Sequence, residues 1–211
     1  MGFGIALIGY AFLLLNEMGG GIFAALLMGY GFFLASRLNA KFAQAAVSVL
    51  FMFPRGVVLA LDIIGVINIT ELTVLNTVTQ AVHLIAWFLV TYFWLNGVME
   101  IARDNKAEKL ESQARARLIL TAVFLIGSLF ITFLTIGGVL QTLPGEIAMG
   151  QYILQYVLIF YNLFFLHTCF ILITSEKQYE KDRHQIAQER AKALEKKHKE
   201  QQEVKNRIGK R

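Results

Sequence analysis

A single arginine stands inside a long apolar stretch, VLFMFPRGVVLALDI, at residues 49–63. Its guanidinium stays charged in proteins and offers five N–H donors in a fixed fork that matches carboxylate and phosphate groups. At the centre of a membrane helix, such a charge costs about 2.5–3.5 kcal/mol on insertion scales. Arg55 therefore needs a partner or a ligand, and the neighbouring Pro54 predicts a kinked or broken helix at this point.

Three kinds of partner for Arg55 are consistent with the sequence. The first is an acid of the same chain, either Asp62 on the same helix face or Glu17 after the first apolar block. The second is an anionic ligand, such as the carboxylate of a small solute or the phosphate of a lipid head group. The third is an acid on a helix of another subunit. The sequence leaves all three open.

The apolar residues that surround Arg55 predict an all-α, polytopic integral membrane protein. The chain has 211 residues, of which 56% are hydrophobic, and its mean hydropathy is +0.54. A helix that crosses a bilayer needs about 20 apolar residues, and six blocks approach or exceed that length. The six predicted transmembrane helices cover about residues 3–16, 21–37, 42–67, 72–99, 116–141 and 147–174. Together they form a single transmembrane domain over residues 1–174, whose shortest span is the first.

The basic residues alternate between the loops. The loops after the second and fourth spans are basic, whereas those after the first, third and fifth hold only acids. Lys and Arg mark the cytoplasmic side of a membrane protein, so both termini are expected in the cytoplasm and the chain in the plasma (inner) membrane. The basic loop residues are Arg37, Lys41, Arg103, Lys106, Lys109, Arg115 and Arg117.

Residues 175–211 form a separate, strongly charged tail. The tail contains twelve lysines and arginines and seven acidic residues, and this difference accounts for the whole formal net charge of +5. The tail is rich in helix formers, so a solvated cytoplasmic helix is expected, either attracting anionic lipid or docking a cytoplasmic partner. No aromatic or motif context accompanies the basic residues, so nucleic acid is not an expected partner.

Polar residues in each of the last four spans fall on one helix face when successive residues are placed 100° apart. The first two spans have no such face and are expected to pack outside it or against a partner. Four polar faces turned toward one another would form a polar layer near the middle of the membrane. The expected ligand-binding residues are Arg55, His83, Gln80, Asn76, Asn162, Gln155 and Ser128, with Asp62 and Glu17 as gating or ion-pair residues.

Other chemistries lack support in the sequence. The motifs HExxH and G-x-S-x-G and a glycine-rich phosphate loop are all missing. His83 and His167 differ in predicted depth by about 13 Å, too much for the two axial ligands of one haem. The single cysteine, Cys169, excludes an intramolecular disulfide and a cysteine-built metal site. No enzymatic activity, metal or cofactor is therefore expected.

Two functions remain. The first is a transporter or translocating subunit in which the last four spans enclose a polar path and Arg55 binds or gates an anionic solute or lipid. The second is a non-enzymatic membrane subunit or scaffold, in a homo-oligomer or with a second membrane subunit, whose intramembrane arginine and basic tail face partners. Polar side chains that only hydrogen-bond between helices, contributing about 0.6 kcal/mol each, are the simplest alternative for the uncharged residues.

Overall fold

A computed structural model describes residues 2–136 and 145–173, and every regular element in these residues is a helix. The predicted all-α class is therefore confirmed for this part of the chain. The predicted tail, 175–211, lies outside the described residues. The elements are α1 (Gly2–Ala11), the 3₁₀ helix η1 (Phe12–Met18), α2 (Gly21–Ala35), α3 (Ala40–Leu50), α4 (Phe53–Ile63), α5 (Thr73–Asp104), α6 (Glu108–Ile136) and a final helix, Gly145–Ile173.

Four helices are long and apolar enough to cross a membrane, which indicates a multi-pass membrane protein. Two further apolar helical segments, Gly2–Met18 and Gly21–Ala35, are shorter. The four long helices are Ala40–Ile63, Thr73–Asp104, Glu108–Leu134 and Gly145–Ile173. One compact unit extends to Phe170. The second begins at Ile171, and its described residues, 171–173, are the last of the final helix.

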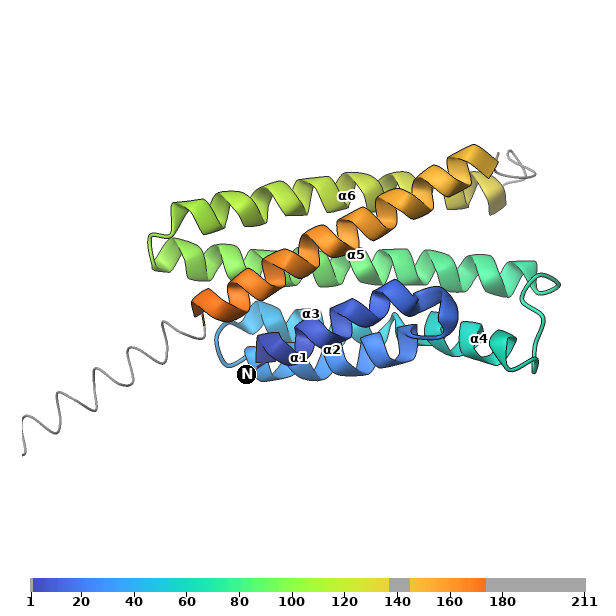
Figure 1. Ribbon diagram of the computed structural model, residues 1–211, viewed down its shortest axis with the longest axis horizontal. Coiled ribbons are helices and arrows are strands. Elements are labelled where there is room, and N and C mark those ends of the chain that lie inside the picture. The colour runs from blue at the N-terminus through green and yellow to red at the C-terminus, as the bar shows by residue number, and fades with distance from the viewer. Residues whose placement is uncertain (1, 137–144, 174–211) are drawn as a thin grey trace, which may run out of the picture. The chain divides into compact units, whose positions relative to one another are not determined.

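Helix α5 is the central element of the first unit. It packs against α3, α4 and α6, and Figure 1 shows α5 and α6 side by side. In the most apolar window of α5, 61% of the residues are buried, compared with 22% in α6. A helix buried to this extent contacts other helices on most of its circumference, so its polar side chains meet protein rather than lipid.

The helix that carries Arg55 is broken beside Pro54. Helix α3 ends at Leu50 and α4 begins at Phe53, with the proline in its first turn. Proline has no N–H to donate, and its ring clashes with the carbonyl four residues back, so the helix cannot continue straight through it. The predicted kink is thus confirmed. It places Arg55 at the start of α4, where the side chain is only 8% exposed.

Helices α1 and α2 form a closely packed pair at the N-terminus. A Cβ atom on Gly31 of α2 would lie 2.3 Å from the backbone nitrogen of Ala6 in α1, so only glycine fits there. Small residues at such crossings let two backbones approach closely, which increases the van der Waals contact that holds membrane helices together.

The expectation that the first two spans pack outside the polar layer is wrong for the first of them. Tyr10 of α1 is fully buried, and its hydroxyl oxygen accepts a hydrogen bond from Nε1 of Trp87 in α5. Asn16 of η1 is 5% exposed and is likewise buried among polar groups. One tyrosine and one asparagine make no stripe on a helical wheel, and so the pattern search missed them.

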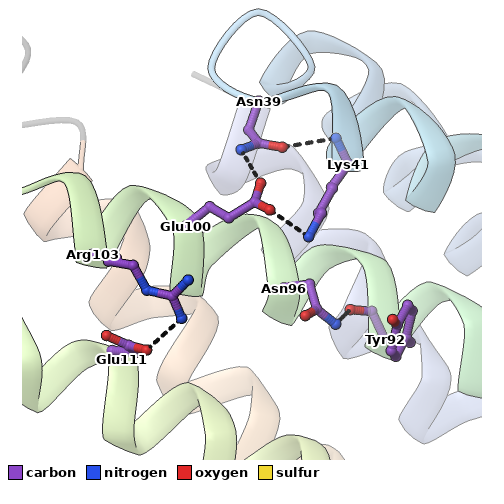
Figure 2. A network of polar contacts seen from close by, with 7 residues as sticks. All are labelled: Asn39, Lys41, Tyr92, Asn96, Glu100, Arg103 and Glu111. Atoms are coloured by element: carbon purple, nitrogen blue, oxygen red, sulfur yellow. Dashed lines mark hydrogen bonds and ion pairs between the residues drawn. The ribbon is translucent and has the colours of Figure 1, made fainter.

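A polar network joins the loops at one end of α5 (Figure 2). Glu100 accepts a hydrogen bond from Nδ2 of Asn39 at 2.8 Å and pairs with Nζ of Lys41 at 2.5 Å. Arg103, one turn further along α5, pairs with Glu111 of α6 at 2.8 Å. The two loops that the sequence predicts to be cytoplasmic therefore lie at the same end of the first unit.

Candidate functional site

A cavity of about 310 Å³ lies among η1, α4, α5, α6 and the final helix. This volume falls at the lower end of the range for pockets that bind small molecules. Twelve of its sixteen lining residues are polar or charged, although most of the chain is hydrophobic. They are Asn16, Glu17, Arg55, Thr73, Asn76, Thr77, Gln80, His83, Leu84, Trp87, Ile131, Thr132, Ala148, Gln151, Tyr152 and Gln155.

One face of α5 forms the longest wall of the cavity. The lining residues run from Thr73, the first residue of the helix, to Trp87, at intervals of three or four residues. That spacing keeps side chains on a single helical face, and it extends for about 21 Å at 1.5 Å per residue. Since Thr73 and Gln151 lie near the starts of their helices, the cavity begins at the end of the first unit opposite Glu100.

Arg55 is held in the cavity wall by uncharged acceptors. Its Nη1 donates to the backbone oxygen of Asn76 at 3.3 Å, to Oδ1 of Asn76 at 2.5 Å and to Oγ1 of Thr79 at 3.5 Å. Among the described residues, no carboxylate oxygen lies within 4.0 Å of its nitrogens, and no protein acceptor meets Nε or Nη2. Part of the guanidinium's bonding capacity is therefore unused by the described residues.

Neither acid predicted to pair with Arg55 forms an ion pair with it. Oδ1 of Asp62 accepts a hydrogen bond from the backbone N–H of Ile69 at 2.9 Å, which stabilises the turn after α4, and Asp62 does not line the cavity. Glu17 does line it, beside Asn16, whose Nδ2 donates to Glu17 at 3.4 Å. Of the acids, Glu17 has the strongest electrostatic effect on Arg55.

Two buried polar atoms of the cavity residues have no hydrogen-bond partner in the described part of the chain: Nδ1 of His83 and Oδ1 of Asn16. His83 is 7% exposed. Its ring lies near the charged group of Arg55 and the backbone of Met52. Buried polar side chains are almost always hydrogen-bonded, so each exception needs a reason. A ligand or ordered water would satisfy Nδ1 of His83, whereas Oδ1 of Asn16 lies against Gly21 at the start of α2.

Three glutamines add neutral hydrogen-bonding groups to the cavity wall. Gln80 comes from α5, whereas Gln151 and Gln155 come from the final helix, one turn apart. Within the described residues, none of the three amides has a hydrogen bond from its side chain to protein. Each amide provides two donors and one acceptor oxygen, so the cavity can recognise a polar molecule along its length.

Besides Asp62, two predicted site residues lie outside the cavity. Asn162 is fully buried, and its Nδ2 donates to Oγ1 of Thr121 at 3.1 Å, joining the final helix to α6. Ser128 is 3% exposed, and its backbone oxygen accepts from Oγ1 of Thr132 at 2.9 Å. Neither residue lines the cavity. The single polar layer expected from the sequence is thus divided into a cavity and a separate buried cluster.

The structure brings six of the nine predicted site residues to one cavity: Arg55, Asn76, Gln80, His83, Gln155 and Glu17. Six further polar lining residues are not among the nine predicted site residues: Asn16, Thr73, Thr77, Thr132, Gln151 and Tyr152. Thr73 and Thr77 share the helical face of Asn76 and Gln80, so their spacing was a usable signal. Asn16 and Tyr152 gave no such signal, because their place depends on how the helices pack.

The cavity is suited to recognition by hydrogen bonds and charge. Among the described residues, no group of three or more His, Cys, Asp or Glu side chains is arranged to hold a metal ion.

Comparisons with protein-family models, with characterised proteins and with solved structures find no match to this chain.

Proposed function

We propose that this chain is a membrane transporter, or the translocating subunit of one, that takes a small solute with an anionic group into the cavity. The observation that carries the proposal is the state of Arg55. A buried guanidinium is retained within the apolar part of a membrane protein and is held by neutral oxygens alone among the described residues. An anion from outside the chain would offset the cost of burying that charge.

In this proposal all six helical segments cross the membrane. Segment α2 has 15 residues, about 22 Å at 1.5 Å per residue, which is shorter than a hydrocarbon core of about 30 Å. The preceding segment gains length because η1 is a 3₁₀ helix, which rises about 2.0 Å per residue. Local thinning of the bilayer around the α1–α2 pair would accommodate the rest of the mismatch.

The proposed orientation places both termini in the cytoplasm and the cavity mouth on the outer side of the plasma (inner) membrane. The shared end of the two basic loops supports it, because Lys41 and Arg103 both belong to the network in Figure 2. The cavity begins near Thr73 and Gln151, which belong to the opposite end. A solute would then enter from outside, and the buried residues beyond Trp87 would close the inner half of the path.

The scaffold function has less support from the position of Arg55. A membrane partner that pairs through an intramembrane acid would need to reach the guanidinium from the lipid-facing surface. Arg55 is 8% exposed and faces a cavity between helices of its own chain. The apolar surface of α6 remains available to a partner or to lipid.

Flux through proteoliposomes tests the proposal. The full chain would be reconstituted and screened with radiolabelled small carboxylates, amino acids and phosphate compounds. We expect uptake of at least one solute class by wild type, and a tenfold or greater loss with Arg55→Gln. Arg37→Gln, an exposed change in a basic loop, is the matched control and should keep wild-type uptake. Wild-type uptake by Arg55→Gln would overturn the proposal, and loss of a co-purifying membrane subunit would favour the scaffold.

A further inference from the structure

Two opposite charges line the cavity without touching each other. Arg55 comes from α4 and Glu17 from η1, and their charged atoms lie further apart than 4.0 Å. Glu17 is the one acid among the described residues that line the cavity, and it is exposed, whereas Arg55 is 8% exposed. Opposite charges attract each other. The fold keeps this pair apart, since Asn76 and Thr79 hold the guanidinium while Asn16 contacts the carboxylate.

We propose that the ligand of this cavity is a small zwitterion, whose anionic group binds Arg55 and whose ammonium group binds Glu17. The inference rests on the proposed function and specifies its substrate class. A zwitterion pairs both charges and leaves the occupied cavity neutral. A simple anion would pair with Arg55 but would be repelled by Glu17 and would leave the cavity with an extra negative charge.

The unused hydrogen-bonding groups near Arg55 and Glu17 support the same polarity for the two ends of the ligand. Near Arg55, the donors Nε and Nη2 lack acceptors in the described residues, and Nδ1 of the neighbouring His83 is also unpartnered. At the other end, the carboxylate of Glu17 accepts only one hydrogen bond from the described residues, from Nδ2 of Asn16 at 3.4 Å. Carboxylates and phosphates accept hydrogen bonds, whereas ammonium groups only donate them. The cavity therefore matches an anion at one end and an ammonium group at the other.

This chemistry has two natural sources: a free amino acid, with its carboxylate and ammonium on one carbon, or the ethanolamine phosphate of a lipid head group. Both carry an anionic group a few bonds from an ammonium group, and both are small relative to a cavity of about 310 Å³. The probes can separate the two sources, because alanine represents the free solute and glycerophosphoethanolamine, a neutral phosphodiester zwitterion, represents the head group.

Thermal stabilisation of the full chain in maltoside micelles tests the inference. The probes are alanine, glycerophosphoethanolamine, propionate, which lacks the ammonium group, and ethylamine, which lacks the anion. We expect at least one zwitterion to stabilise the protein at a tenfold lower concentration than either singly charged probe. Stabilisation by alanine alone identifies a free solute, and stabilisation by glycerophosphoethanolamine alone identifies a head group. Propionate acting at the same concentration as the zwitterions would overturn the inference.

Two charge-removing variants assign the ends of the ligand. Glu17→Gln should abolish the preference for zwitterions over singly charged probes, so that propionate and alanine stabilise the variant at similar concentrations. Arg55→Gln should abolish the thermal stabilisation by both propionate and alanine. Glu71→Gln, which removes an exposed acid outside the cavity, is the matched control and should retain the preference. An unchanged preference in Glu17→Gln would overturn the inference.

The flux assay keeps the two proposals distinguishable. If an anionic solute without an ammonium group is transported in an Arg55-dependent way while no zwitterion stabilises the chain, the zwitterion inference fails and the proposed function stands. If no probe stabilises the protein and no solute is transported, both fail together.

Discussion

The indole Nε1 of Trp87 donates a hydrogen bond to the hydroxyl oxygen of Tyr10 at 3.2 Å, which joins α5 to α1 at the inner end of the cavity. Tyr10 is fully buried and also interacts with Asn162, which in turn donates to Thr121. Side chains from α1, α5, α6 and the final helix thus meet in one polar cluster. In the proposed transporter, this cluster closes the path on the cytoplasmic side and has to rearrange before a solute can pass.

Trp87→Phe should lower the free energy of unfolding by about 1–3 kcal/mol. The change removes a donor and leaves the hydroxyl of a buried tyrosine with one partner fewer. Tyr10→Phe should also destabilise the protein, because it removes the acceptor of the Trp87 indole in a fully buried site. The double variant should be less destabilised than the sum of the two single variants, by about 0.5–1.5 kcal/mol, since the lost hydrogen bond is counted only once.

Titration with SDS in mixed micelles would measure these unfolding free energies. Trp94→Phe is the control, because Nε1 of Trp94 has no hydrogen-bond partner in the described residues and this variant loses no such bond. Strict additivity of Trp87→Phe and Tyr10→Phe would show that the 3.2 Å contact contributes nothing to stability.

Gly31→Ala should strongly destabilise the α1–α2 pair. The new Cβ would lie 2.3 Å from a backbone nitrogen of Ala6, so the two helices would have to separate. Overpacking of this kind typically costs about 1–3 kcal/mol, and a clash with backbone lies at the upper end. Gly29→Ala, two residues away on the same helix, is the matched control because its Cβ would meet nothing closer than 3.9 Å.

The control should be neutral or stabilising by up to about 1 kcal/mol, because alanine favours helix over glycine by that amount. The same SDS titration compares the two variants. Equal stability of Gly29→Ala and Gly31→Ala would contradict the close approach of α1 and α2.

Periodicity and helix-breaking residues predicted much of this fold. The four long helices follow from apolar length, and the break before α4 follows from Pro54. The α5 wall of the cavity was also predictable, because Asn76, Gln80 and His83 recur at helical spacing and share one face. These features depend on residues close together in the sequence.

The remaining features depend on packing between distant segments. The sequence predicted Arg55 in a polar layer near the middle of the membrane, but its long side chain reaches Asn76, in the first turn of α5. Charged side chains extend toward the nearest polar environment in this way, and a count of backbone positions does not include it. Asn162 shares a face with Gln155, yet it lies seven residues further along the helix and joins the buried cluster instead.

Glu100→Gln should have a small, salt-dependent effect on stability. Glu100 pairs with Lys41, but the two side chains are 42% and 33% exposed, so solvent screens the pair. We expect a loss of at most about 1 kcal/mol, because the glutamine can still accept from Asn39. The difference from wild type should shrink in 0.5 M salt, whereas a loss of several kcal/mol independent of salt would contradict a screened surface pair.

Labelling of introduced cysteines should show from which side the cavity opens. Cys169 is the single cysteine of the chain and is fully buried. In a Cys169→Ala background, any reactive thiol is therefore the introduced one. In sealed right-side-out vesicles, we expect a membrane-impermeant thiosulfonate to modify Thr73→Cys at the cavity mouth and Gln80→Cys inside it. Lys106→Cys, in a basic loop at the opposite end, should react only after permeabilisation, since positive residues mark the cytoplasmic side. Modification of Lys106→Cys in sealed vesicles, with Thr73→Cys protected, would reverse the proposed orientation.

A solute bound at Arg55 should slow modification of Gln80→Cys more than that of Thr73→Cys, because Gln80 lies about 10 Å deeper along α5 at 1.5 Å per residue. Equal rates with and without solute would place the binding site outside this cavity.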